Sequence, residues 1–238
     1  PETLAEWKGF FAAAVSRVPS GSLEVRRIAL MKREFLDPLV KKSEAYLATI
    51  SIEDALRDRA AHPERKNLLL NGDFAVGPTE RAPRHVGIFE PKRGWTGGWI
   101  AMDVPGAGFE IVPDAPKGVA RSLRITVTGK SKRYELSQNL MGHVGHLKPN
   151  TRYRFSAFVK LDNVVAHSRG GGAGVRIWDD HNRYFPQASL VGTTGWIHQC
   201  YEFVSGPDTE KFQPTVSLQL CGATGSVYFA DARFEEIK

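Results

Sequence analysis

A strict alternation of apolar and polar residues runs through the second half of the sequence. In the segment 152–162, Tyr153, Phe155 and Ala157 alternate with Arg154. The same period of two recurs in the segments 122–128, 174–180, 196–204, 215–222 and 226–237. This period is typical of a β-strand with one face in a core and the other toward solvent. Turn-forming residues rather than helical patterns separate these segments, so the sequence predicts a mainly β fold, an antiparallel β-sandwich or barrel.

The first 65 residues follow a different pattern, in which apolar residues recur every three or four positions as in amphipathic helices. A short helix is predicted to begin at Ser51 and to end near Ala61, because Pro63 follows. We therefore expect two parts: a helical segment over 1–65, either the tail of a preceding domain or a connector, and a β domain over 66–238. The sequence does not begin with Met, which fits a piece of a longer polypeptide.

Charge and hydropathy narrow the function classes. The net charge of +6 at pH 7 is spread thinly along the chain, whereas a nucleic-acid binder usually carries a basic stripe. No apolar run approaches the ~20 residues that a membrane-spanning helix needs. We therefore expect neither a nucleic acid nor a membrane as a partner. Cys200 and Cys221 lack the spacing of a metal site, and both two free thiols and one disulfide stay open.

Six short motifs follow one another in the second part. They are NLLLNGDF at 67–74, GW at 94–95, SLRITVTG at 122–129, LKPNTRYRFSAFVK at 147–160, GTTGWIHQCYEFVSGPDT at 192–209 and VYFADARFEEI at 227–237. In this order they resemble the jelly-roll carbohydrate-binding modules of the galactose-binding-like superfamily, of the type appended to xylanases and glucanases. Residues 1–65 resemble more faintly the helical tail of glycoside-hydrolase-like proteins.

The resemblance implies a two-sheet antiparallel jelly roll whose ligand lies on a concave face or on loops at one end, with the NLLLNGDF leucines as its first strand. It also implies a non-catalytic module that binds a polysaccharide or oligosaccharide as a monomer. The module would belong to a larger secreted glycan-active protein, with a catalytic domain of the same polypeptide as its partner. The corresponding location is extracellular, periplasmic or at the cell surface.

Many members of this superfamily hold a structural Ca²⁺ between the first and last strands, so the resemblance implies such an ion here. Asp73 and Asp231 match acidic positions near that site. Two further acidic positions of the family are Ala75 and Ala230 in this sequence. A hard cation of this kind takes six to eight oxygen ligands, so the two alanines weaken the match.

Sugars stack their C–H faces on aromatic rings, and planar polar groups bond their hydroxyls. If Val175 and Ile177 face the core, Arg176 and Trp178 project together from the other face; the alternative is that a loop covers Trp178. The further ligand-binding candidates are Trp99, Phe158, Asp180, Asn182, Tyr184 and Gln219. Phe158 and Gln219 have the outward parity of neighbouring strands, and Trp99 is expected to be open enough to flank a cleft.

Two other functions compete with glycan binding. The jelly roll could be a spacer that docks on a catalytic domain without binding sugar, in which case Trp178 is covered. It could also be a polysaccharide lyase or hydrolase, and hydrolysis needs two carboxylates across a cleft. The sequence contains no nucleophile elbow, P-loop or His-Glu-x-x-His motif, so we expect no enzyme in this chain.

Overall fold

The computed structural model describes residues 51–76, 95–96, 98–101, 104–130, 133–168, 170–178, 189–205, 209 and 214–237. All of them belong to one compact unit, Ala45–Lys238. The helices predicted before Ser51 lie outside these residues. Within the described ranges, no helix is both long and apolar enough to cross a membrane.

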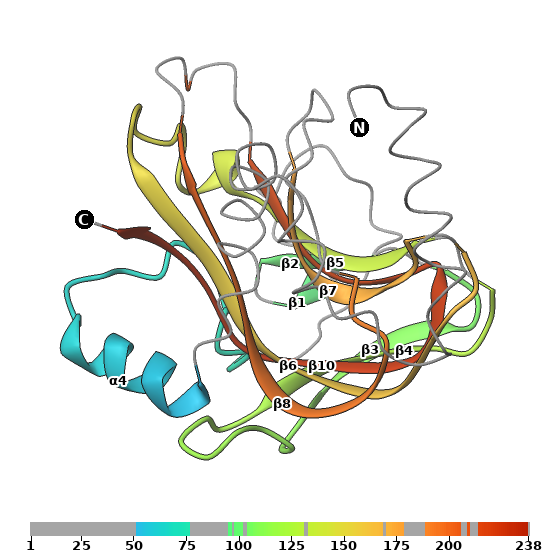
Figure 1. Cartoon of the computed structure of the whole chain (residues 1–238). Helices are drawn as coiled ribbons and strands as arrows, with labels where there is room; N and C mark the ends of the chain where they lie inside the picture. The colour runs from blue at the N-terminus through green and yellow to red at the C-terminus, as the bar shows by residue number, and fades with distance from the viewer. Residues whose placement is uncertain are drawn as a thin grey trace, which may run out of the picture. The chain divides into compact units, whose positions relative to one another are not determined.

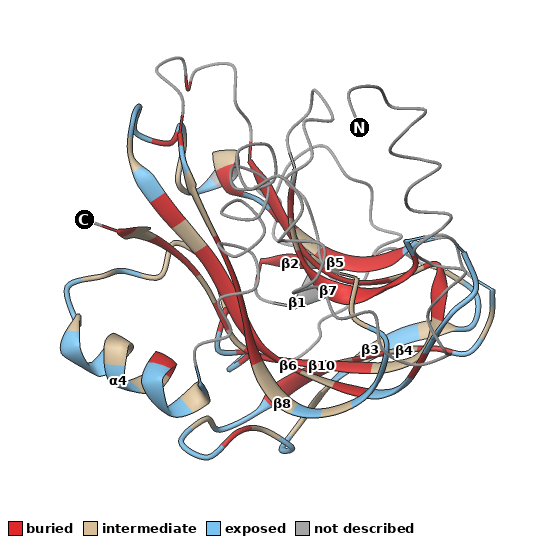
Figure 2. Cartoon of the chain, viewed as in Figure 1, coloured by how far each residue is buried: buried red, intermediate tan, exposed pale blue. Residues whose placement is uncertain are grey.

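The described part begins with helix α4, Ile52–Ala61, which confirms the short helix predicted there. Ser51 is its N-cap: the hydroxyl oxygen accepts the backbone N–H of Asp54 at 3.1 Å, which satisfies one of the free donors of the first turn. The helix ends at His62, next to Pro63, which cannot continue it. Most of α4 is exposed or half-buried in Figure 2, and Ala55 is its buried residue.

The strands form two antiparallel sheets that lie as layers in Figure 1. In spatial order, the first sheet contains β1 (Trp95–Thr96), β2 (Trp99–Ala101), β5 (Tyr134–Asn139), β9 (Thr215–Cys221) and β7 (Gly172–Trp178). The second sheet contains β3 (Ala107–Val112), β4 (Ser122–Val127), β10 (Ala223–Ile237), β6 (Arg152–Ala166) and β8 (Gly192–Val204). A short 3-10 helix, η1 (Leu140–Gly142), follows β5.

From β4 onward, each successive strand lies in the other sheet, as in a jelly roll. The predicted antiparallel β-sandwich is therefore confirmed.

The core lies between the two sheets, where the period of two directs alternate side chains inward. Phe155, Val159 and Leu161 of β6 are buried, as the alternation predicts. Tyr153 of the same strand stacks on Phe234 of β10, with ring centroids 5.4 Å apart and planes 4° apart. Each such side chain contributes about 1.5–3 kcal/mol by leaving water. The buried residues follow both sheets in Figure 2.

The NLLLNGDF segment at 67–74, which we call the opening motif, differs from its prediction. Its turn at Asn71–Asp73 is present, but residues 67–70 form irregular backbone rather than the first strand. The side chain of Asn67 provides the pairing that a strand would have made: its Nδ2 donates to the Ala232 carbonyl at 2.9 Å, and its Oδ1 accepts the Phe234 N–H at 3.0 Å. Leu69 and Phe74 still enter the core.

The last strand is bulged where it passes this motif. The register of β10 against β6 shifts between Ala230 and Arg233, and Asp231 within the shift has φ +46°. This left-handed conformation is uncommon outside glycine, although Asp tolerates it better than most residues. The bulge places Asp231 at the corner where the first and last segments of the sandwich meet.

Candidate functional site

The outer face of the first sheet carries polar side chains on three adjacent strands. On β5 and β9, Glu135 stands opposite Gln219, and Ser137 stands opposite Ser217. On β7, Arg176 stands opposite Ser217 in turn. Directly opposite residues of an antiparallel pair share a face, with Cβ atoms about 4.5–5.5 Å apart. We call this group the polar face: Glu135, Ser137, Asn139, Arg176, Thr215, Ser217 and Gln219.

Two oxygen atoms of the polar face are buried without a hydrogen-bond partner within the described part of the chain: Glu135 Oε2 and Ser217 Oγ. Glu135 is 4% exposed and Ser217 is 0% exposed. The other carboxylate oxygen of Glu135 accepts a hydrogen bond from Arg133 Nη2 at 2.6 Å. A buried polar atom left unpaired costs about 1–3 kcal/mol, and such atoms often mark the place of a ligand or an ordered water.

The pKa of Cys221, which lies at the end of β9, is shifted by burial and by the charged residues of this face. Burial, and after it the carboxylate of Glu135, raise the pKa of Cys221 to about 11, while Arg133 and Arg176 lower it in part. The thiol is therefore protonated at neutral pH and is no nucleophile. No disulfide joins Cys200 and Cys221, so both are thiols, one of the two possibilities that the sequence left open.

Of the predicted ligand-binding residues, the structure brings Arg176 and Gln219 together on the polar face, on the adjacent strands β7 and β9. The backbone of Trp178 pairs with Thr215 beside them, and its side chain lies outside the described residues. Asp180, Asn182 and Tyr184 lie outside the described residues as well. For these four residues, ligand binding stays a prediction.

Trp99 and Phe158 are not on an open surface, contrary to expectation. Trp99 is 0% exposed, because its indole faces the core and its Nε1–H donates to the Asn71 carbonyl at 3.1 Å. Phe158 does project from the outer side of its sheet, but it packs with Ala55 of α4 and is buried. It belongs to the second sheet, so it is no neighbour of Gln219 either.

The sequence reasoning missed Glu135. The alternation around it is hidden, because the inward position 138 is a glutamine rather than an apolar residue. Gln138 is nevertheless buried on the same side as Tyr134 and Leu136. Recognising that one glutamine as a core residue would have placed Glu135 and Ser137 on the outer face.

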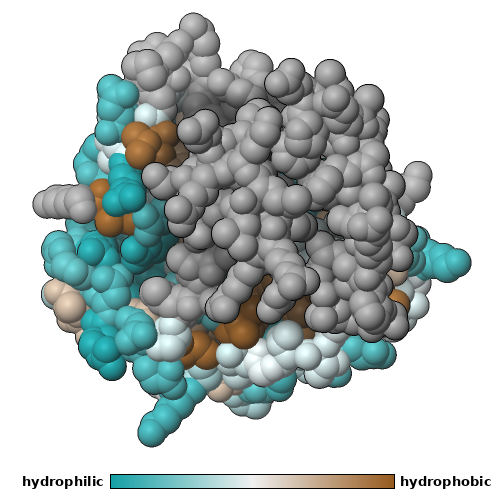
Figure 3. All heavy atoms as spheres, viewed as in Figure 1, coloured by the Kyte–Doolittle hydropathy of each residue, from teal (hydrophilic) through white to brown (hydrophobic). Residues whose placement is uncertain are grey.

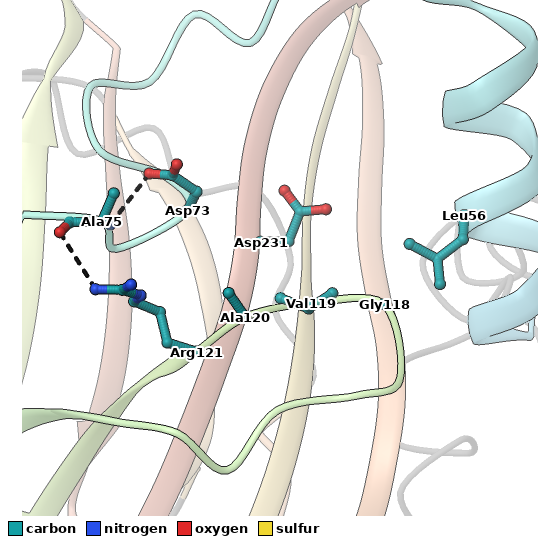
Figure 4. A pocket seen from close by; sticks show the side chains of 8 residues that line it. All are labelled: Leu56, Asp73, Ala75, Gly118, Val119, Ala120, Arg121 and Asp231. Carbon is teal, nitrogen blue, oxygen red and sulfur yellow. Dashed lines mark hydrogen bonds between the residues drawn. The ribbon is translucent and has the colours of Figure 1, made fainter.

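A second feature is a pocket of about 370 Å³ at the corner between the opening motif and the bulge of β10 (Figure 4). It is lined by Leu56, Asp73, Ala75, Gly118, Val119, Ala120, Arg121 and Asp231. It therefore contains both residues predicted to hold Ca²⁺, Asp73 and Asp231.

The residues of this corner do not fit a calcium site. The carboxylate of Asp231 forms an ion pair with Arg59 of α4, and the Ala75 carbonyl accepts a hydrogen bond from Arg121 Nη1 at 3.3 Å. In the described ranges, no group of three or more His, Cys, Asp or Glu residues is placed to hold a metal ion. A hard cation would need six to eight oxygens, and guanidinium groups already contact the Asp231 carboxylate and the Ala75 carbonyl.

Comparisons with known proteins give fold likeness only. No protein-family model and no curated protein matches the chain. Among solved structures, it is similar to the enzymatically active domain of bacteriophage CBA120 tailspike protein 4 (12% identity, 59% of this chain, 19% of that chain, TM-score 0.40). It is also similar to the CBM22-1 xylan-binding domain of Paenibacillus barcinonensis Xyn10C (16% identity, 60% and 88%, TM-score 0.41). A third is a cyclase from Fischerella sp. TAU (16% identity, 71% and 96%, TM-score 0.45).

Proposed function

We propose that the polar face binds a carbohydrate without catalysing a reaction on it. The observation that carries this proposal is the pair of buried, unpartnered oxygens, Glu135 Oε2 and Ser217 Oγ, on adjacent strands of one face. Sugar hydroxyls are donors as well as acceptors, so they can satisfy a carboxylate and a serine hydroxyl at the same time. An apolar ligand would leave both oxygens unpaired and would be rejected.

The remaining chemistry of the face suits the same ligand. Gln219 adds a planar amide and Arg176 adds a planar guanidinium to the same face; both have contacts within the protein, and a hydroxylated ligand would share their bonding groups. The sequence parity puts Trp178 on this face too, where its ring would stack on a sugar. Recognition would thus combine fixed polar groups on rigid strands with one aromatic surface at the β7 edge.

The composition of the face favours binding over hydrolysis. Among its described residues, Glu135 is the one carboxylate, whereas a glycosidase uses a pair. A sugar hydroxyl that donates to Glu135 would be bound but not cleaved. The described part of the face has no second acid that could protonate a leaving group. We further propose that the module serves a larger secreted glycan-active protein, with the catalytic domain of that polypeptide as its partner. The resemblance of the sequence motifs supports this part of the proposal.

One observation favours the spacer alternative. The central side chains of the polar face are buried, with Gln219 at 4% exposure and Ser217 at 0%. A docking face that binds no sugar would also be covered. Glycan binding therefore requires that the face become accessible to the ligand, and the spacer alternative does not.

Affinity gel electrophoresis of the full chain against neutral and acidic polysaccharides separates the two functions. Ser217→Ala removes one hydroxyl and keeps the strand, so binding should weaken about tenfold if that hydroxyl contacts the ligand. The matched control is Ser226→Ala on the second sheet, whose hydroxyl lies 2.9 Å from Thr126 Oγ1; it should bind as the wild type does. Absence of retardation by every polysaccharide, or equal retardation of Ser217→Ala and wild type, would overturn the proposal.

A further inference from the structure

Two arginines contact oxygen atoms at the corner between the opening motif and β10. Arg59 comes from α4 and pairs with Asp231 on the bulge of β10. Arg121 comes from the segment before β4 and donates to the carbonyl of Ala75 in the opening motif. Figure 4 shows Asp73 and Asp231 on the same side of the Gly118–Arg121 segment, with Leu56 of α4 beyond Asp231.

Arg59 is held more tightly than a surface arginine. Its side chain is 11% exposed, and its guanidinium carbon lies 4.5 Å from the centroid of the Phe158 ring. Its Nη2 donates to Ser156 Oγ at 3.5 Å. Burial lowers the pKa of Arg59 and the Asp231 carboxylate raises it in part, and an arginine keeps its charge under such shifts. A positive charge is therefore fixed beside Asp231 by three different contacts.

The substitutions that remove acidic residues from this corner also fit the helix. Ala230, where the resemblance implies a second acid, is 0% exposed and packs with Ala55 and Phe158 under α4. A carboxylate at position 230 would be buried against the apolar side of the helix, which is costly without a partner. Ala75, the other lost acid, contributes its backbone carbonyl to Arg121 instead.

Further ion pairs hold α4 in this place. Asp58 bonds Arg154 Nη1 of β6 at 2.8 Å and Arg65 Nη1 at 2.8 Å, and Arg154 Nη2 in turn reaches Glu202 of β8 at 2.7 Å. The described surface on the α4 side is accordingly mostly hydrophilic in Figure 3. The helix thus contacts the sheet through Ala55 on one turn and through the charged side chains of Asp58 and Arg59 on the next.

We propose that Arg59, delivered by α4, takes the structural place of a metal ion at the corner between the first and last segments of the sandwich. In this arrangement the cation is covalently part of the chain, and Arg121 completes it on the side of the opening motif. The helix is then an integral structural element, and the fold is independent of Ca²⁺. This inference stands on contacts away from the polar face and is independent of glycan binding.

The first test is thermal unfolding of the full chain by circular dichroism in CaCl₂ and in EDTA, together with calorimetric titration of CaCl₂ into the chain. We expect equal midpoints, within about 1 °C, and no binding heat. A midpoint several degrees higher in CaCl₂ than in EDTA would overturn the proposal. This measurement uses the native chain, so it decides the question even if a variant does not fold.

The second test compares two arginines on the same helix. Arg59→Met keeps an apolar stem over Phe158 but leaves Asp231 with only the longer contact to Arg233 Nη1 at 3.9 Å, and the midpoint should fall by about 10 °C. Arg57→Met is the matched control, because Arg57 is 76% exposed and pairs only at the surface with Asp54; its midpoint should change by about 1 °C or less. Adding Asp231→Asn to Arg59→Met should restore part of the loss. Equal midpoints for the two single variants would refute the role of Arg59.

Discussion

The carboxamide of Gln138 makes two hydrogen bonds with the backbone of Leu70. The Leu70 N–H donates to Oε1 at 3.1 Å, and Nε2 donates to the Leu70 carbonyl at 2.6 Å. Gln138 is a buried residue of β5, whereas Leu70 lies in the irregular opening motif. A side chain thus serves as the strand neighbour that the opening motif lacks, and it joins this motif to the first sheet.

Gln138→Leu should therefore destabilise the protein although it adds apolar surface to the core. The variant leaves the N–H and C=O of Leu70 without these partners, which we expect to lower the free energy of unfolding by about 2 kcal/mol. Urea unfolding followed by fluorescence measures this change. The control is Asn139→Ala, which removes an exposed cap of η1 and should cost at most about 1 kcal/mol. A loss no greater than that of the control would show that the two bonds contribute little.

Gly72 is held so closely that a methyl group does not fit. A Cβ there would lie 2.1 Å from the Ala232 carbonyl oxygen, and the Gly72 carbonyl itself accepts the Ala232 N–H at 2.8 Å. Gly72→Ala should lower the free energy of unfolding by about 3 kcal/mol, because backbone on both sides must move. Gly195→Ala on β8 has nothing within 4 Å of its new Cβ and should stay within about 0.5 kcal/mol of the wild type. Chemical unfolding of both variants checks the contrast, and equal losses would contradict the tight approach.

His198 should make stability depend on pH. Burial beneath α4, and then the charges of Arg59 and Arg154, lower the pKa of His198 from 6.5 to about 4, although Asp58 opposes them. The unfolded chain therefore binds more protons between these two values. The stabilisation from a neutral His198 is complete above about pH 6.5 and is lost as the pH falls toward 4, a change of about 3 kcal/mol.

Urea unfolding at pH 4.5, 5.5 and 7 measures this dependence. Phe158, whose ring centroid lies 5.5 Å from that of His198, leaves little room for water around the ring. His198→Gln cannot titrate, so its stability should fall less steeply over the same interval. Parallel curves for the variant and the wild type would exclude His198 as the source.

The sequence predicted the strands whose alternation is carried by large apolar residues. The segments 152–162 and 215–222 became β6 and β9, with the expected residues in the core. It gave no sign of β3, because that edge strand contains a glycine and none of its residues is fully buried. A strand could be predicted where its inward residues are large, apolar and buried. The prediction failed for β3, whose residues are at most partly buried.

The errors at the candidate site have a different cause. Parity correctly directed Phe158 away from the sandwich core, but parity cannot show that a helix over a hundred residues earlier covers it. Trp99 lies in a strand of three residues, too short for an alternation to decide its direction. Glu135 was missed because its neighbour Gln138 is a polar core residue that bonds backbone far away in the sequence. Each error concerns a contact between distant segments.

The position of α4 also bears on how the protein can be divided. The change of sequence pattern at residue 66 invites a cut there, yet that cut would remove Ala55 and Arg59, which both pack on Phe158. Phe158 and Ala230 would then lose the cover that α4 gives them, and exposed apolar patches of this kind promote association between molecules. A fragment meant for expression should therefore begin before Ser51, because α4 covers part of the outer face of the second sheet although its sequence suggests a connector.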